Sequence, residues 1–348
     1  MSRDEFKKTE LIAESTEDYA LLDFGNGRCL ERMGLFTVSR PDLNATSQPS
    51  DGKWQADWEH IINGATGIWR PCKTGLKNNW QLRYAEKLCQ VELDGKGGTG
   101  FQAEQSLCAQ WVEQRLSGCY HLENLRVLIL FGGGGCVTAS ACAAGATVVH
   151  VNPSDAQLER SRSVINDNTV DWVHEDPLAH VEQLIREHQK FHLILVRPPQ
   201  IQRGPHHRSW DIKVDLAALV MNIPRLLAEQ HRGVWLSPQM HGWQAESLAE
   251  MLYAAMPGRD IELLQLAVRC VDGRTLPAGV AARLTEDEVL SVDGVRPVLD
   301  AASMEERLEV ALEAVLSSRR TASKPAQELA GCDRQQQEFV LHWVDVLS

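Results

Sequence analysis

Residues 125–145 read Leu-Arg-Val-Leu-Ile-Leu-Phe-Gly-Gly-Gly-Gly-Cys-Val-Thr-Ala-Ser-Ala-Cys-Ala-Ala-Gly. The apolar run at 125–131 predicts a buried strand, and the small residues at 136–145 predict a helix. Between them stand four glycines, Gly132–Gly135, which let the backbone turn sharply and approach a bound nucleotide closely. The N–H groups that open the helix would face this ligand. We therefore predict a cofactor loop; the alternative is a tight turn that binds nothing.

The chain around this stretch alternates between strand-length apolar runs and helix-length amphipathic runs. The predicted strands are 126–131, 147–151, 170–174, 192–196, 233–236, 261–270 and 280–284, and the predicted helices are 136–145, 154–164, 177–189, 211–230 and 244–256. This alternation is typical of βαβ units on a parallel sheet. A turn at Asp272-Gly273 predicts that the last strand runs antiparallel to its predecessor. We expect an α/β protein with a Rossmann-like, doubly wound domain.

Two regions of different composition flank this domain. Residues 1–115 hold five of the ten tryptophans and a predicted hairpin, in which Gly25-Asn-Gly27 joins two short strands. Residues 285–348 carry two predicted helices, at 303–318 and 333–347, whose apolar faces would pack on the domain or form a homodimer or protein-partner interface. We expect a small β-rich lobe at 1–115, the Rossmann-like domain at 116–284 and a helical extension at 285–348.

Composition excludes several classes of protein. With 43% hydrophobic and 24% charged residues the chain is expected to be globular, and no apolar run is long enough to predict a membrane span. The N-terminus has no apolar signal segment, so the cytoplasm is the expected compartment. Nine cysteines occur without a Cys-x-x-Cys pair, which predicts reduced thiols and no metal site. The net charge of −12 disfavours a protein that coats nucleic acid but is compatible with a local basic patch.

The residues near the glycine run indicate which nucleotide it would bind. Of the dinucleotide fingerprint G-x-G-x-x-G, Gly132 and Gly134 are present but Val137 stands at the third glycine. The acid expected on the ribose about 20 residues further on is replaced by Asn152, which lacks a carboxylate. No Gly-x-Ser-x-Gly elbow is present, and no Gly-Lys-Ser/Thr follows the glycines, which disfavours a serine hydrolase and a nucleotide hydrolase.

Four segments, the glycine run among them, follow one another in a characteristic order. They are Gly100-Phe-Gln-Ala-Glu-Gln105 with Trp111 after it, Gly132–Gly135, Arg197-Pro-Pro199, and Leu276-Pro-Ala-Gly279 with Ala281-Ala-Arg283. Together with the hairpin at Tyr19–Gly27, they resemble the class I S-adenosylmethionine (SAM)-dependent methyltransferases, in the branch of the bacterial large-subunit ribosomal RNA methyltransferases. The resemblance covers residues 19–284. It implies SAM as the cofactor and RNA, specifically ribosomal RNA, as the substrate.

The resemblance also implies a role for each matched residue. The positions expected at the cofactor are Phe101, Gln105, Gly132, Gly133, Gly134, Asn152, Glu175 and Asp176. The glycines would lie under the methionine and ribose, and Asn152 would contact the ribose. Asp176, or alternatively Glu175, would bind the adenine amino group. Pro198 and Pro199 would line the transfer site.

Departures from the family pattern bear on activity. Arg197 replaces the aspartate of the family's Asp-Pro-Pro, so a permanently charged donor stands where an acceptor is expected. Ser237-Pro238 stands where relatives that methylate cytosine C5 have a nucleophilic cysteine, which disfavours that chemistry. The motifs are thus degenerate, and three hypotheses follow: a SAM-dependent methyltransferase, a catalytically inactive binding or assembly protein with the same fold, and an NAD-dependent oxidoreductase.

A basic segment follows the fourth predicted strand of the domain. It contains Arg197, Arg203, His206, His207, Arg208, Trp210 and Lys213. Cations at the carboxyl edge of the sheet, with an aromatic ring beside them, would grip phosphate and stack a base. The loop at 197–213 is therefore the expected RNA contact, with a solvated polar loop as the alternative.

Overall fold

The computed structural model describes residues 6–63, 66–117, 119, 124–165, 167–205, 209–239 and 242–284. The predicted helices at 303–318 and 333–347 lie outside these residues. Within the described residues, no helix combines the length and apolar character that a membrane crossing requires.

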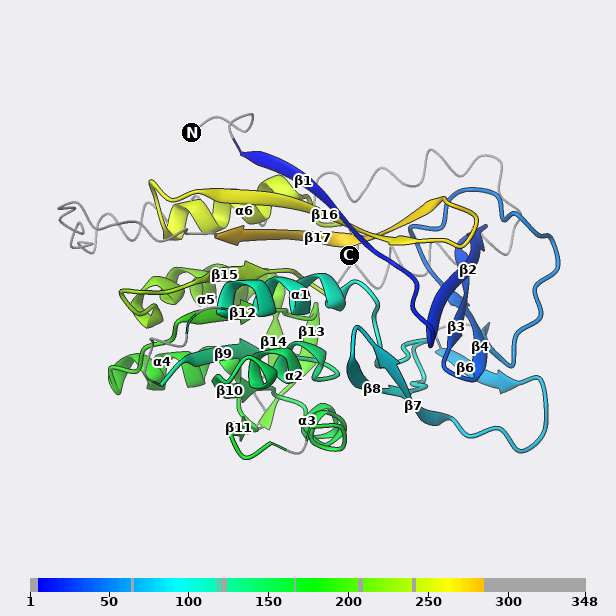
Figure 1. Ribbon diagram of the computed structural model, residues 1–348, viewed down its shortest axis with the longest axis horizontal. Helices are drawn as coiled ribbons and strands as arrows, with labels where there is room; N and C mark the ends of the chain where they lie inside the picture. Colours follow the sequence, from blue (N-terminus) through cyan, green and yellow to red (C-terminus); the bar gives the residue numbers. More distant parts are fainter. Residues whose placement is uncertain are drawn as a thin grey trace.

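An eight-stranded sheet forms the centre of the molecule (Figure 1). From one edge to the other its strands are β1 (Lys7–Ala13), β16 (Ile261–Arg269), β17 (Thr275–Leu284), β15 (Gly233–Leu236), β12 (Leu193–Val196), β9 (Arg126–Leu130), β10 (Thr147–Val151) and β11 (Val170–Val173). All neighbours pair in parallel except β17, which is antiparallel to both β15 and β16. The expected doubly wound sheet with an antiparallel last strand is confirmed. Strand β1 was not expected there, and it extends the sheet by pairing with β16.

Helices cover both faces of this sheet because its strands are apolar on both sides. One face carries α1 (Gln105–Leu116) and α2 (Cys136–Ala143), and α3 (Asp155–Arg162) lies beside the start of α2. The opposite face carries α4 (Pro177–Arg186), α5 (Ile212–Leu226) and α6 (Ala245–Ala255). Side chains of β9 alternate between the two cores: Ile129 belongs to the α1–α2 core, and Leu128 and Leu130 belong to the other.

Short polar side chains fix where three of these helices begin. Ser154, Asp176 and Asp211 each accept a hydrogen bond from a backbone N–H of the first turn of α3, α4 and α5, respectively. Each cap satisfies an N–H group that has no partner within the helix. Ser154 and Asp176 lie after β10 and β11, at the carboxyl edge of the sheet, and Asp211 is the last residue of β14 (Ser209–Asp211).

A β-rich lobe lies at the far end of the long β16–β17 hairpin (Figure 1). It contains the five-stranded sheet β2 (Tyr19–Gly25), β3 (Arg28–Met33), β4 (Phe36–Pro41), β5 (Trp58–Asn63) and β6 (Thr66–Pro71), and the hairpin β7 (Asn79–Tyr84) with β8 (Lys87–Glu92). The expected hairpin between β2 and β3 is confirmed. Asn26 and Gly27 both have positive φ, 51° and 76°, as the tight turn requires.

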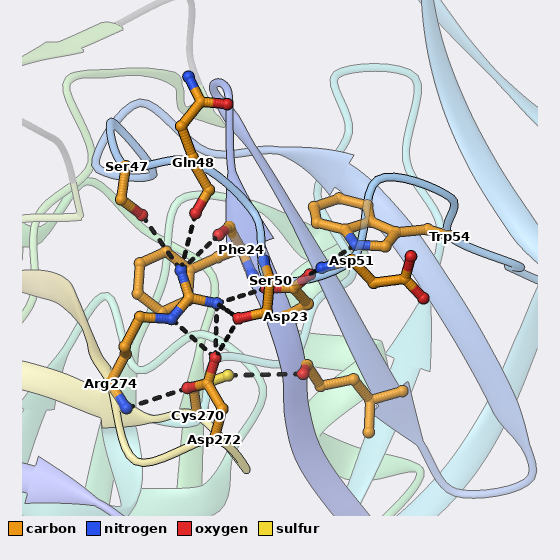
Figure 2. A network of polar contacts seen from close by, with 11 residues as sticks. Asp23, Phe24, Ser47, Gln48, Ser50, Asp51, Trp54, Cys270, Asp272 and Arg274 are labelled. Atoms are coloured by element: carbon orange, nitrogen blue, oxygen red, sulfur yellow. Dashed lines mark hydrogen bonds and ion pairs between the residues drawn. The ribbon is translucent and has the colours of Figure 1, made fainter.

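One arginine joins this lobe to the large sheet (Figure 2). Arg274, in the β16–β17 turn, forms ion pairs with Asp23 of β2 and with Asp272, and it donates to the carbonyls of Phe24 and Gln48. Its guanidinium carbon also lies 4.4 Å from the centre of the Phe24 ring. A planar group with five donors suits this convergence of acceptors. The lobe is therefore fixed to the tip of the hairpin.

Asp23 makes this junction sensitive to acid. Burial alone would raise the pKa of Asp23, but hydrogen bonds from the Asp51 and Ser50 amides, the Trp54 indole and Arg274 outweigh burial and lower it to about 2. The unfolded value is about 3.9. Because the folded pKa is the lower one, the stabilisation is complete above pH ~4 and is lost as the pH falls from ~4 to ~2.

We expect Asp23→Asn to destabilise the protein at pH 6 and to lose this disadvantage as the pH falls. Urea unfolding of both proteins at pH 6, 4 and 3 measures the difference. A difference in free energy of unfolding that stays constant over this range would contradict the role of Asp23.

Candidate functional site

The carboxyl ends of β9, β10 and β12 meet at one edge of the sheet. Gly132–Gly135 follow β9, Asn152 follows β10 and Arg197 follows β12. Since β9 is flanked by β10 on one side and β12 on the other, the direction in which the chain is wound reverses here. In open α/β sheets this switch point is where ligands bind. The fold thus brings the predicted cofactor loop, ribose position and transfer site together.

Gly132 and Gly133 have different surroundings in the loop. A Cβ on Gly132 would lie 2.4 Å from Cε1 of His150 and 2.9 Å from Cγ2 of Ile129, so the protein's own packing requires glycine there. Gly133 has φ +59°, and a Cβ on it would meet only the ends of two side chains, Gln105 at 3.6 Å and Arg197 at 3.8 Å. Of the four glycines, Gly133 is therefore the least crowded, and the space beside it is bounded by Gln105 and Arg197.

An ion pair borders this space. Nη2 of Arg197 lies 2.9 Å from Oε1 of Glu104, the residue before α1, and the two side chains are only 14% and 12% exposed. Burial raises the pKa of Glu104, and the charge of Arg197 partly offsets this rise. Burial likewise lowers the pKa of Arg197, but a guanidinium stays protonated at neutral pH.

Two buried polar atoms beside Gly133 lack a hydrogen-bond partner in the structure. They are Nη1 of Arg197, a donor, and Oε1 of Gln105, an acceptor. Buried polar groups are nearly always hydrogen-bonded, so such atoms indicate a place for a ligand or water. Both side chains line a small pocket. Its other walls come from α1, β15, β16 and β17 and from the segment after β15, where Ser237 and Pro238 lie.

Asn152 is at the expected place after β10 but is fully buried. Its Oδ1 accepts from the amide of Ser154 at 2.9 Å and from Nε2 of Gln202 at 3.3 Å, and its Nδ2 donates to Gln157 at 2.9 Å. A ribose hydroxyl would therefore have to replace one of these partners.

The two acidic residues after β11 serve local structure. Asp176 is 1% exposed, and its Oδ1 accepts from the amide of Ala179 at 3.0 Å as the cap of α4. Oε1 of Glu175 accepts from the amide of Asp176 at 2.8 Å, and the Glu175 side chain is half-buried. Of the two, Glu175 is the more accessible to an adenine amino group.

Phe101 and Gln105 enter the site differently. Phe101 is buried in an aromatic cluster with Tyr19 and Tyr84, at ring-centre distances of 5.2 and 5.3 Å, so it supports the site from the lobe. Gln105 opens α1 and faces Gly133 directly. The lobe therefore holds the N-terminal side of the site in place.

The Arg197-Pro-Pro199 segment is held by hydrogen bonds to its carbonyl groups. The carbonyl of Pro198 accepts from the amide of Gln239, and that of Pro199 accepts from the indole of Trp210 at 2.9 Å. Trp210 is fully buried, and its ring centre lies 4.7 Å from that of Phe131. The expectation that Trp210 stacks an RNA base is therefore corrected: in this structure its ring has no face open to a base.

The rest of the predicted RNA loop forms a small hairpin of β13 (Ile201–Arg203) and β14. Arg203 is exposed on β13, next to the Gln202 that contacts Asn152. Lys213 lies in the first turn of α5. His206, His207 and Arg208 lie outside the described residues.

Two residues near the site carried no recognisable signal in the sequence. His150 lies on β10, and its Nδ1 is 2.8 Å from Oγ1 of Thr138; burial lowers its pKa to about 3, so the ring is neutral. Gln202 reaches Asn152 from the β13–β14 hairpin. Both contacts join residues of different elements, and neither residue belongs to a known motif.

No protein-family model matches the chain, and no curated protein matches it either. Among solved structures it is similar to the SAM-dependent methyltransferase from Agrobacterium tumefaciens, with 25% identity and a TM-score of 0.74, over 82% of this chain and 97% of that one. A candidate methyltransferase in complex with S-adenosylhomocysteine (SAH) gives 12% identity and a TM-score of 0.58, over 77% of this chain and 74% of that one. A candidate SAM-dependent methyltransferase from Streptococcus mutans gives 10% identity and a TM-score of 0.59, over 77% of this chain and 75% of that one. The chain has the class I methyltransferase fold.

Proposed function

We propose that this protein is a SAM-dependent methyltransferase. The observation that carries the proposal is the likeness to the Agrobacterium enzyme, which spans 82% of this chain and nearly all of that one. The glycine loop at the switch point of the sheet supports it, because this is where such a fold binds its ligand.

The residues at the switch point fit the cofactor. The space over Gly133 and the two unpartnered atoms, on Gln105 and Arg197, suit a ligand with donors and acceptors at its polar end. The side-chain amide of Asn152 would bind the ribose in place of its present partner Gln202. Glu175 or Asp176 would lie at the adenine. When bound, SAM supplies a methyl group on a positively charged sulfur, which makes the methyl carbon reactive.

The chain's own contribution to the reaction is mainly geometric. Transfer from sulfur to an acceptor is an in-line displacement, so the protein accelerates it by aligning both partners and excluding water. The Arg197-Pro-Pro199 segment is held by Gln239 and Trp210 and is suited to forming a rigid wall for the acceptor. The pocket beside Glu104 and Arg197 would receive the group that is methylated.

Calorimetric titration with SAM tests the proposal. We expect saturable one-to-one binding, and weaker binding by at least about tenfold, or 1.4 kcal/mol, in Gly133→Val, whose side chain would fill the space over the loop. Gly145→Val is the matched control, because Gly145 also has positive φ (+83°) but lies after α2 with open space around it.

The absence of binding to folded protein would overturn the proposal and favour an inactive binding or assembly protein. Binding of NAD in place of SAM would instead favour an oxidoreductase. Equal losses in Gly133→Val and Gly145→Val would place the cofactor elsewhere.

We further propose RNA as the class of acceptor. The support is the exposed Arg203 on a hairpin that contacts the cofactor-proximal Asn152, together with the basic residues that follow it in sequence. Each phosphate contact contributes to the salt dependence of binding. Arg203→Ala with Arg208→Ala is therefore expected to weaken RNA binding and reduce its dependence on salt; unchanged binding and unchanged salt dependence would reject RNA contact through this loop.

A further inference from the structure

We propose that Glu104 is a specificity-determining residue that lets the site accept the positive charge of SAM. This rests on the proposed function. Arg197 brings a permanent cation to the switch point, where the family pattern has an aspartate. A cation at that position repels a second cation, and the sulfur of SAM is one. Glu104, at 2.9 Å from Arg197, cancels the charge of Arg197 and removes this repulsion.

The ion pair is buried beside the glycine loop, so a change in the charge of either member would act strongly on a ligand bound there. Both side chains are almost fully buried, so neither water nor salt screens them well. The guanidinium approaches Gly133, the least crowded glycine of the loop, to within 3.8 Å of where a Cβ would stand. A charge left unbalanced on Arg197 would therefore act directly on a ligand in the loop.

Neighbouring charged side chains already have partners of opposite charge. Arg40 lies 2.7 Å from Glu31, and Arg283 lies 2.6 Å from Glu262. Replacing Glu104 by the isosteric glutamine would thus leave Arg197 as an added unbalanced cation, while keeping a hydrogen-bond acceptor in place.

Comparing SAM with its demethylated product, S-adenosylhomocysteine (SAH), isolates this effect. The two molecules share their adenosine, ammonium and carboxylate groups and differ by one methyl group and one positive charge at sulfur. Contacts to the shared groups cancel in the ratio of the two Kd values. The ratio therefore reports the electrostatic environment of the sulfur, which a merely structural role of Glu104 would not change.

The experiment is calorimetric titration of the full chain with SAM and with SAH. We expect Glu104→Gln to weaken SAM relative to SAH by about tenfold, or 1.4 kcal/mol. We expect Arg197→Gln, which leaves an unbalanced anion, to shift the ratio toward SAM. The double variant, in which both charges are gone, is expected to return the ratio to within about threefold of the original value.

Glu113→Gln is the matched control. Glu113 lies on α1 and forms an ion pair with Lys87 at 2.9 Å, but it does not line the pocket. Its replacement is expected to leave the SAM-to-SAH ratio unchanged.

Four outcomes would overturn the inference or its premise. If the unmodified protein binds both ligands and Glu104→Gln lowers the affinity for SAM and for SAH equally, Glu104 has only a structural role. The proposed function would then remain intact. If Glu104→Gln does not fold, an unchanged ratio in Arg197→Gln or a shifted ratio in the double variant overturns the inference. Failure of the unmodified protein to bind either ligand would reject the proposed function itself.

Discussion

Trp210→Ala is expected to lower the free energy of unfolding by about 3–5 kcal/mol, the cost of removing a fully buried large aromatic side chain. Trp210 is completely inaccessible, packs on Phe131, and belongs to the core between the sheet and α4–α6. Its loss would leave a cavity directly under the segment that carries Arg197. The indole also donates to the carbonyl of Pro199, so the alanine variant leaves that carbonyl without its donor.

Urea unfolding measures this change, and Trp210→Phe separates its two causes. Phenylalanine keeps most of the ring packing but not the hydrogen bond, so its cost should be near 1 kcal/mol for the bond plus a small cavity term. Should Trp210→Ala unfold like the unmodified protein while losing RNA affinity, the ring would be a base-stacking group and not a core residue.

Gly132→Ala is expected to destabilise the protein by about 1–3 kcal/mol, the range for inserting atoms into a packed core. The added Cβ would lie 2.4 Å from the His150 ring and 2.9 Å from Ile129. His150 is fully buried and contacts Thr138 and Trp172, which restrict its movement. The loss should appear in unfolding experiments without any cofactor present.

His150→Ala provides the test of the cause. It costs stability by itself, but it removes the two nearest atoms that the new Cβ would meet, both of the His150 ring. The double variant should therefore be more stable than the sum of the two single changes predicts, by roughly 1 kcal/mol or more. Strict additivity would show that the two positions do not interact.

Much of the large sheet could be predicted because each of its central strands is an apolar run between turn residues. Strands β10 and β15 have the predicted bounds, and β9 differs by one residue. Helix α4 ends earlier than predicted, at Arg186, because His188 takes a left-handed backbone conformation (φ +54°). Helix α1 was not predicted since it is buried on most of its surface, which removes the polar face that gives a helix its periodic pattern.

The site was predictable in position but not in its contacts. Motif order placed Gly132–Gly135 and Arg197 on one edge of the sheet, as the structure does. Contacts across elements, such as His150 under Gly132 or Gln202 against Asn152, depend on register and loop geometry that local sequence does not encode. Trp210 was misassigned for the same reason: an aromatic residue in a basic loop looks accessible until the hairpin of β13 and β14 turns it inward.

The pairing of β1 with β16 has a consequence for how the protein is made. Lys7–Ala13 are synthesised well before their partner Glu262–Val268, which follows about 250 residues later in the chain. Contacts of such long sequence separation slow folding, because a large loop must close before they form. The first strand must remain without its partner throughout synthesis of the lobe and of β9 to β15. Its exposed lysines, Lys7 and Lys8, are charges of the kind that keep an unpaired edge from joining other chains during this interval.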